Sequence, residues 1–173
     1  MHGNFWTLFN CFAAAVDKPK HWIIRVYDGQ NFKNSKYAFW GVKRGRCGAM
    51  KTMVQKIKPK DILWFLTNKE SGGKIIGMAE FTYFVDREDE SLIQIHTCTN
   101  EEQGWTRDDD WCIQIHYKNL YFTEKQCFYA SIQCAGTIMS YDVWRNKGVI
   151  RYDLDMHYQN FVFYAEPADR PEL

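Results

Sequence analysis

The sequence lacks the features of a secreted, membrane-spanning or disulfide-linked protein. Its 173 residues include no apolar run long enough to cross a bilayer, and residues 1–4 have neither the basic start nor the cleavage site of a secretory signal. Its six cysteines are scattered without a paired framework, which favours reduced thiols. We therefore expect a soluble intracellular protein, cytoplasmic or nuclear, that contacts no membrane.

The motifs on which enzymes depend are also missing. The glycines in residues 41–48 match neither the dinucleotide-binding nor the P-loop spacing, and no serine lies in a nucleophile-elbow sequence. Cys112 and His116 are spaced so that a strand would hold them far apart, and no Cys-x-x-Cys pair accompanies them. Residues 108–110 are three aspartates, which are more typical of a solvated loop than of a site. We expect a non-enzymatic protein with no catalytic residues, no metal and no cofactor.

Charge is divided along the chain, although the formal net charge is only +1. Residues 17–60 hold 12 lysines and arginines against two aspartates, a local charge of +10. Residues 86–110 hold nine acidic residues against two arginines, a local charge of −7. A basic sector beside aromatic residues is typical of a protein that binds a polyanion, because phosphate contacts release counterions.

Residues 21–41 combine an apolar strand, a polar turn and a second short strand that contains a tryptophan. The first strand is expected at residues 21–27, and Asp28 and Gly29 end it with turn chemistry. Hydrogen-bonding side chains crowd the turn, and Trp40 then presents a flat apolar surface next to Gly41, where a ligand can approach the backbone closely. This combination predicts a pocket for a planar ligand with polar edges, such as a nucleobase.

The rest of the chain predicts a single α+β domain built on a small curved sheet or barrel flanked by helices. Apolar periodicity predicts a packed helix within residues 1–19 and a second helix at 49–57. Apolar runs predict strands at 62–66, 74–85, 111–117 and 149–152, a long acidic loop at 86–109 and a terminal helix at 155–163. We expect the domain to span residues 20–165, with residues 166–173 forming a tail.

A nucleobase can be bound by stacking on aromatic side chains, and this sequence contains many of them. Two aromatic faces around an extruded base contribute about 1–3 kcal/mol per base, and hydrogen bonds to the base edge add selectivity. Trp40 and Trp105 are the candidates for these faces, because Trp105 lies isolated in the acidic loop. Trp22, Trp64 and Trp111 are expected in the core.

Three stretches carry a resemblance to a known family. Residues 21–40 resemble, without a gap, the start of YTH domains, in which an apolar strand leads through a polar turn to Lys-Tyr-x-x-Trp, here from Lys36 to Trp40. Residues 62–80 are similar to the family's apolar strand, Ser-Gly turn and Gly-x-Ala-Glu strand, and Asp110-Trp111 looks like its later strand. Residues 40–65 are also similar to the EVE domain, a relative in the PUA-like superfamily. The resemblance covers roughly residues 20–165 and implies a PUA-like (YTH/EVE-type) fold.

The resemblance also implies a function, the recognition of N6-methyladenine by an aromatic cage. By position, Trp40 and Trp105 would be cage walls, and Asn31 would bond the base edge. The carbonyl of Gly41 would accept the methylamino N–H, and the backbone of Tyr27 would face the base. Burial of the methyl group among aromatic faces would supply the selectivity.

The implied partner is single-stranded RNA or DNA that carries a methylated base. By the same resemblance, its phosphates would contact Arg25, Lys43, Arg44 and Arg46. Val26 stands where the family has serine, so the identity of the base stays open.

Other functions remain open from the sequence alone. An EVE- or ASCH-like protein of the PUA-like superfamily that binds a different modified base or a small ligand is one alternative. A small nucleotide-directed hydrolase with histidine or aspartate near the same cleft is a second alternative. A protein-interaction domain that uses the basic and acidic sectors is a third.

Overall fold

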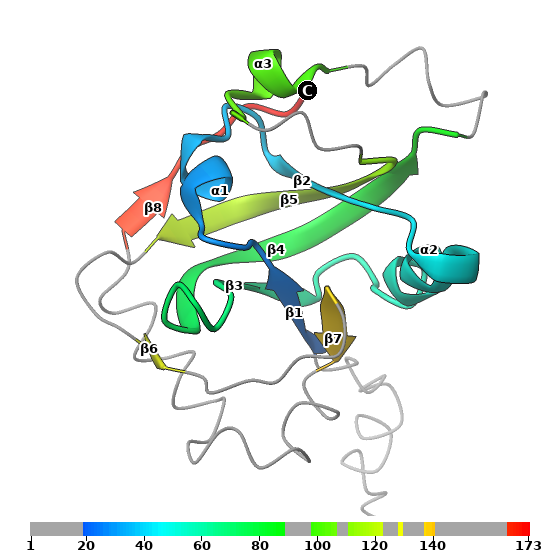
Figure 1. Cartoon of the computed structure of the whole chain (residues 1–173), viewed down its shortest axis with the longest axis horizontal. Helices are drawn as coiled ribbons and strands as arrows, with labels where there is room; N and C mark the ends of the chain where they lie inside the picture. Colours follow the sequence, from blue (N-terminus) through cyan, green and yellow to red (C-terminus); the bar gives the residue numbers. More distant parts are fainter. Residues whose placement is uncertain (1–18, 89–97, 107–110, 123–127, 130–136, 141–165) are drawn as a thin grey trace, which may run out of the picture.

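A computed structural model describes residues 19–88, 98–106, 111–122, 128–129, 137–140 and 166–173. Its centre is one mixed sheet in the order β2-β5-β4-β3-β1-β7, with β6 paired to β4 and β8 paired to β5. Figure 1 shows β4 (Lys74–Asp86) and β5 (Ile113–Phe122) running side by side across the molecule. The remaining strands are β1 (His21–Arg25), β2 (Phe39–Val42), β3 (Ile62–Leu66), β6 (Phe128–Tyr129), β7 (Ile138–Ser140) and β8 (Glu166–Ala168).

The sheet curls into a half-barrel because its longest strands bend. The register between β4 and β5 shifts twice, between Met78 and Glu80 and again between Phe81 and Phe84, and β3 and β4 shift once. Such irregularities increase the local twist of a sheet. The predicted α+β class with a small curved sheet flanked by helices is therefore confirmed.

The first strands form as their apolar runs predict. β1 and β3 pair in parallel, and their central residues are buried, as expected for strands covered on both faces. The carboxylate of Asp61 joins the starts of the two strands, since it accepts hydrogen bonds from the Trp22 indole and from the backbone N–H groups of Lys20 and Lys58. The core contains Trp22, Trp64 and Trp111, as predicted.

Short helices lie between the strands. The polar stretch after β1 forms a helix, α1 (Gln30–Asn34), and is not only a turn. A 3-10 turn, η1 (Arg46–Gly48), precedes α2 (Ala49–Val54), which lies within the predicted helix at 49–57. The predicted loop at 86–109 includes the short helix α3 (Asn100–Gln103). No helix among the described residues is long and apolar enough to cross a membrane.

The C-terminal segment differs from the prediction. Residues 166–173, expected to be a tail, contribute β8, which pairs with the end of β5 (Figure 1). Arg170 then donates to the Tyr117 hydroxyl at 2.8 Å and to the Phe32 carbonyl at 2.7 Å. The segment is part of the fold because its arginine bonds a carbonyl of α1 and a buried tyrosine. The predicted helix within residues 1–19, the strand at 149–152 and the helix at 155–163 lie outside the described residues.

Candidate nucleobase pocket

A pocket of about 160 Å³ opens between α1, β2, the 43–50 segment and the residues after α3. At about 30 Å³ for each water molecule in the liquid, this volume corresponds to roughly five waters, so the pocket can hold one small ring system. All five residues predicted to bind a base line it: Tyr27, Asn31, Trp40, Gly41 and Trp105. They come from four separate segments of the chain, so only the fold brings them together.

Three tryptophans form the apolar walls of this pocket. Trp40 and Trp105 lie with ring centroids 5.1 Å apart at 60°, and Trp105 and Trp111 lie 5.3 Å apart at 73°. All three are at least nine-tenths buried, with 5%, 8% and 5% exposed. Trp111 was expected only in the core, yet it also lines the pocket.

This geometry differs from the predicted pair of parallel stacking faces. A base between two rings needs about 7 Å between the ring planes, twice the contact distance of carbon atoms. Trp40 and Trp105 touch edge to face and leave no such gap. The rings form a corner, which can surround a small apolar substituent such as a methyl group.

The absence of a side chain at Gly41 leaves room for the ring of Trp111, one of the three walls. An added Cβ would lie 2.7 Å from two ring carbons of Trp111 and 3.0 Å from Trp105. The sequence suggested that this glycine lets a ligand approach the backbone, but in the structure the Trp111 ring occupies the space beside its Cα. Packing of the walls therefore requires glycine at this position.

Hydrogen bonds fix the orientation of two walls. The Trp105 indole donates to the Ser35 hydroxyl at 2.8 Å, and that hydroxyl donates to the main-chain carbonyl of Asn31 at 2.8 Å. The Trp111 indole donates to the side chain of Asn100 in α3. Both walls are thereby tied to short helices that flank the pocket.

The segment that bears Trp105 is itself anchored. Thr99 and Glu102 form a reciprocal capping box at the start of α3, which also lowers the pKa of the Glu102 carboxyl through the hydrogen bonds from Thr99. The buried Gln103 side chain accepts from the Tyr37 N–H and donates to the carbonyls of Tyr37 and Phe39. These bonds connect α3 to the entry of β2, which carries Trp40.

The polar edge of the pocket is formed by Asn31. Its Oδ1 accepts from the backbone N–H of Thr106 at 3.2 Å and from the Thr106 hydroxyl at 3.3 Å. The side-chain amide therefore lies where a base edge can meet it, as predicted. Its role in binding a base stays a prediction.

Tyr27 is held in an unusual conformation at the rim. Its φ of 52° is in the left-handed region, and 49% of the residue is exposed. Its carbonyl accepts from the Asn68 N–H at 2.6 Å. The carbonyl thus already accepts one hydrogen bond, and the contact of the Tyr27 backbone with a base stays a prediction.

The predicted phosphate-binding cations have different surroundings. Lys43 lines the pocket and is exposed. Arg46 is exposed but is not a lining residue, and Arg25 is half-buried at the end of β1. Arg44 is instead engaged with acidic residues, at 2.5 Å from Asp86 and 2.7 Å from Glu88. Its predicted contact with phosphate would compete with these two ion pairs.

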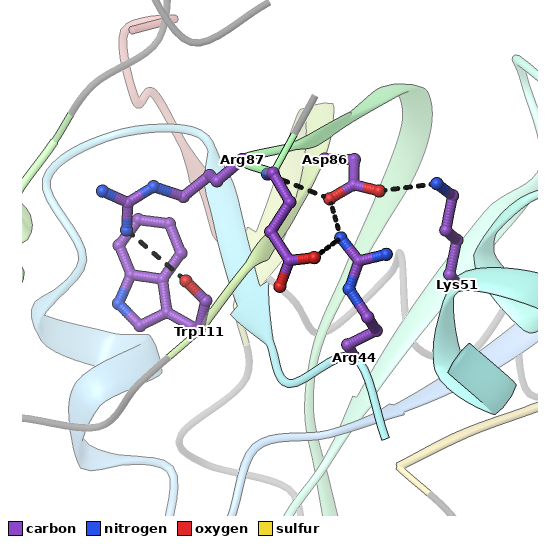
Figure 2. A network of polar contacts seen from close by, with 6 residues as sticks. Arg44, Lys51, Asp86, Arg87 and Trp111 are labelled. Atoms are coloured by element: carbon purple, nitrogen blue, oxygen red, sulfur yellow. Dashed lines mark hydrogen bonds and ion pairs between the residues drawn. The ribbon is translucent and has the colours of Figure 1, made fainter. Parts of the chain in front are cut away.

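Asp86 is the centre of this network. Figure 2 shows Arg44 and Lys51 converging on its carboxylate, with Lys51 Nζ at 2.8 Å. Burial alone would raise the pKa of Asp86, but the hydrogen bonds from Lys51 and the Glu88 N–H and the charge of Arg44 outweigh it and lower the pKa. The guanidinium of Arg87 lies 4.4 Å from the ring centroid of Trp111, so the network borders the third wall.

Trp111 and Thr106 are among the pocket residues that the sequence analysis missed. Trp111 was assigned to the core although it follows Asp110 in a stretch that resembles the YTH strand, and that stretch was the available signal. Thr106 directly follows Trp105, but nothing in its local sequence indicates that it bonds Asn31. Among the described residues, no group of three or more histidine, cysteine or acidic side chains is arranged to hold a metal ion.

No protein-family model matches the chain, and no curated protein matches it in sequence. Among solved structures, ASCH from Zymomonas mobilis aligns over 87% of this chain and 99% of its own, with 8% identity and a TM-score of 0.43. A single-residue mutant of that protein covers 85% of this chain and 99% of its own, with 9% identity and a TM-score of 0.45. A hypothetical protein from Leishmania major covers 87% of each chain at 11% identity and a TM-score of 0.35. At scores of this size the alignments establish no shared function.

Proposed function

We propose that this protein binds a methylated nucleobase, N6-methyladenine first among the candidates, in single-stranded RNA or DNA and without catalysis. The observation that carries the proposal is the corner of three tryptophans beside the Asn31 amide. Such a corner gains from burial of a methyl group, whereas an unmethylated amine would lose water from its second N–H without a new partner. The YTH-like order of residues 21–40 supports the same ligand.

The positive charge around the pocket favours a polyanion, a nucleic acid, as the molecule that carries the base. Lys43 lines the pocket, and Arg46 is exposed in the same loop. A methylated ammonium group would also suit an aromatic corner, but these cations oppose a positively charged ligand. A backbone of phosphates fits the same surroundings without that cost.

The test is a titration with short RNA and DNA oligomers that contain one N6-methyladenine or one adenine, at a stated salt concentration. We expect the methylated oligomer to bind about 5- to 30-fold more tightly, the equivalent of about 1–2 kcal/mol for the buried methyl and the displaced N–H. Trp40→Ala should remove the difference. Equal binding of both oligomers by the wild-type protein would refute the proposal and leave a general nucleic-acid module.

Trp40→Ala removes a buried ring and is expected to cost about 3–5 kcal/mol of stability, so a second variant is needed. Trp105→Phe keeps an aromatic side chain in the core but withdraws part of the pocket wall and the indole bond to Ser35. Circular dichroism verifies that each variant is folded before its affinity is interpreted. A folded Trp105→Phe protein with an unchanged methyl preference would also count against the cage.

The role of the cations is tested by the salt dependence. Each phosphate contact with single-stranded nucleic acid contributes a slope of about −0.7 in log affinity against log salt. Lys43→Ala and Arg46→Ala should each reduce the slope by about this amount and leave the methyl preference intact. Lys56→Ala is the matched control, because Lys56 is exposed but belongs neither to the pocket lining nor to the loop that carries Lys43 and Arg46.

The alternative functions are distinguished by the same panel. Tighter binding of another methylated base, such as N4-methylcytosine, would support the alternative of a different modified base. Turnover of nucleotide substrates that survives Trp40→Ala would favour the hydrolase.

A further inference from the structure

The helix α1, which carries Asn31, is too short to hold its own position. It has five residues, and no side chain caps its first turn. Most backbone groups of so short a helix lack an intrahelical partner, and a helix of this length is not stable alone. Its place beside the pocket must therefore be set by contacts with other segments.

Arg170 provides such a contact from the segment that follows β8. Its Nη2 donates to the carbonyls of Phe32 at 2.7 Å and Lys33 at 3.3 Å, near the end of α1, where intrahelical partners run out. Its Nη1 donates to the hydroxyl of Tyr117 in β5 at 2.8 Å. The guanidinium also lies 5.1 Å from the ring centroid of Phe32. One side chain thus joins α1 to a central strand of the sheet.

The next residue holds the strand that carries Trp40. The carbonyl of Pro171 accepts from the N–H of Ala38 at 2.9 Å, directly before β2. Figure 1 shows the segment running from β8 past α1. None of its residues belongs to the described lining of the pocket. Residues 170 and 171 therefore hold two elements that carry pocket residues without touching a ligand themselves.

We infer that Arg170 is a positioning residue for the pocket, which keeps α1 and its neighbours at the spacing that a bound base requires. This inference rests on the proposed function and adds a determinant outside the pocket. A shift of α1 would reach two walls. The Phe32 ring packs against Trp40 with centroids 5.8 Å apart, and the main-chain carbonyl of Asn31 holds Trp105 through Ser35.

The expected effect of losing Arg170 is specific to the base. Without its bonds, α1 leaves its place for part of the time, and only molecules with α1 in place can enclose a base. The apparent affinity for the base then falls by the fraction that stays competent. Phosphate contacts of Arg46 belong to a separate loop and should not change.

The experiment compares three short RNA oligomers that contain N6-methyladenine, adenine or an abasic site at the same position. Arg170→Met keeps an unbranched side chain but removes every donor. We expect it to bind the methylated oligomer about tenfold more weakly, and the abasic oligomer as tightly as the wild-type protein does. Arg170→Lys keeps the charge but cannot bridge β5 and α1 with a planar fork, so it should weaken methylated binding severalfold.

Asp61→Ala is the matched control for instability. The Asp61 carboxylate is buried and accepts three hydrogen bonds at the starts of β1 and β3, and it does not line the pocket. The folded variant should lose stability but keep its affinity for the methylated oligomer. Hydrogen exchange gives a second readout: the Lys33 amide, bonded to the Gly29 carbonyl, should exchange faster relative to the β4 amides in Arg170→Met only.

The outcomes separate this inference from the proposed function. A wild-type protein that prefers the methylated oligomer, with a folded Arg170→Met variant that binds it equally tightly, overturns the inference alone. If Arg170→Met does not fold, an unchanged affinity in Arg170→Lys has the same meaning. An equal loss of methylated binding in Asp61→Ala assigns the effect to general instability and also overturns the inference. A wild-type protein with no preference for the methylated base overturns the proposed function and this inference with it.

Discussion

Replacement of Gly41 by alanine tests how closely the pocket walls are packed. An added Cβ would lie 2.7 Å from Cγ and Cδ2 of Trp111, nearly 1 Å inside the usual carbon–carbon contact of about 3.5–4.0 Å. Gly41 is not among the glycines with positive φ, so the cost is steric and does not come from the backbone conformation. The Trp111 ring cannot move away without disturbing its bond to Asn100 and its contact with Arg87.

We expect Gly41→Ala to destabilise the protein by about 2–3 kcal/mol, the range for overpacking together with one weakened hydrogen bond. For a chain of this size the loss corresponds to a fall in Tm of about 4–12 °C. Denaturant titration followed by tryptophan fluorescence measures the free energy, and the oligomer titration measures the methyl preference. The preference should also decrease, because the displaced ring is a wall of the pocket.

A double-mutant cycle identifies the source of this cost. In a Trp111→Ala background both clashing carbons, Cγ and Cδ2, are removed, and Gly41→Ala should then cost less than about 1 kcal/mol. A change below about 0.5 kcal/mol for Gly41→Ala in the wild-type background would refute the steric reasoning. An equal cost in both backgrounds would refute the assignment to Trp111.

Three further predictions concern groups around the pocket. Because the pKa of Asp86 is lowered from its ordinary value of 3.8, its ion pairs stabilise the protein above about pH 4, and this contribution is lost as the pH falls through the folded-state pKa. Denaturant titrations from pH 7 to pH 2 should show that Asp86→Asn flattens this part of the acid dependence; an unchanged profile would contradict the role of Asp86. Tyr27→Gly relieves a left-handed backbone and should change stability by less than about 0.5 kcal/mol, while Tyr27→Ala should destabilise by about 1 kcal/mol. Equal effects of the two substitutions in thermal unfolding would show that the conformation carries no strain. Arg170→Met should cost about 2–4 kcal/mol, because it leaves the buried Tyr117 hydroxyl without this donor and the Phe32 carbonyl with only the Ser35 N–H. A loss under about 1 kcal/mol in urea denaturation would show that residues 166–173 contribute little to the stability of the fold.

The division of charge along the sequence has a partly structural explanation. Arg44 and Lys51 from the basic sector meet Asp86 and Glu88 from the acidic sector in one network (Figure 2). Part of the basic sector is therefore neutralised within the fold. Arg46, which is exposed in the same loop, is a better candidate for a phosphate contact than Arg44.

The sequence by itself located strands β1, β3 and β4 and five residues that line the pocket. Residues 62–66 form β3 within the predicted limits, and residues 74–85 form β4 with one further residue, because continuous apolar runs are stable only where both faces of a strand are covered. Trp40 and Asn31 could be identified because a polar turn followed by a tryptophan is a local pattern. Trp105 was added because it lies isolated in the acidic loop, and the YTH resemblance assigned it to the second cage wall.

Tertiary structure decided how these residues act together. The angle between Trp40 and Trp105 depends on the anchoring of α3 by Gln103, and no local pattern encodes a contact between residues so distant in sequence. The third wall, Trp111, and the clamp from Thr106 to Asn31 arise in the same way. Burial and hydrogen bonding in this pocket join segments separated by up to 75 residues, so its shape and polar edge exist only once the sheet has curled.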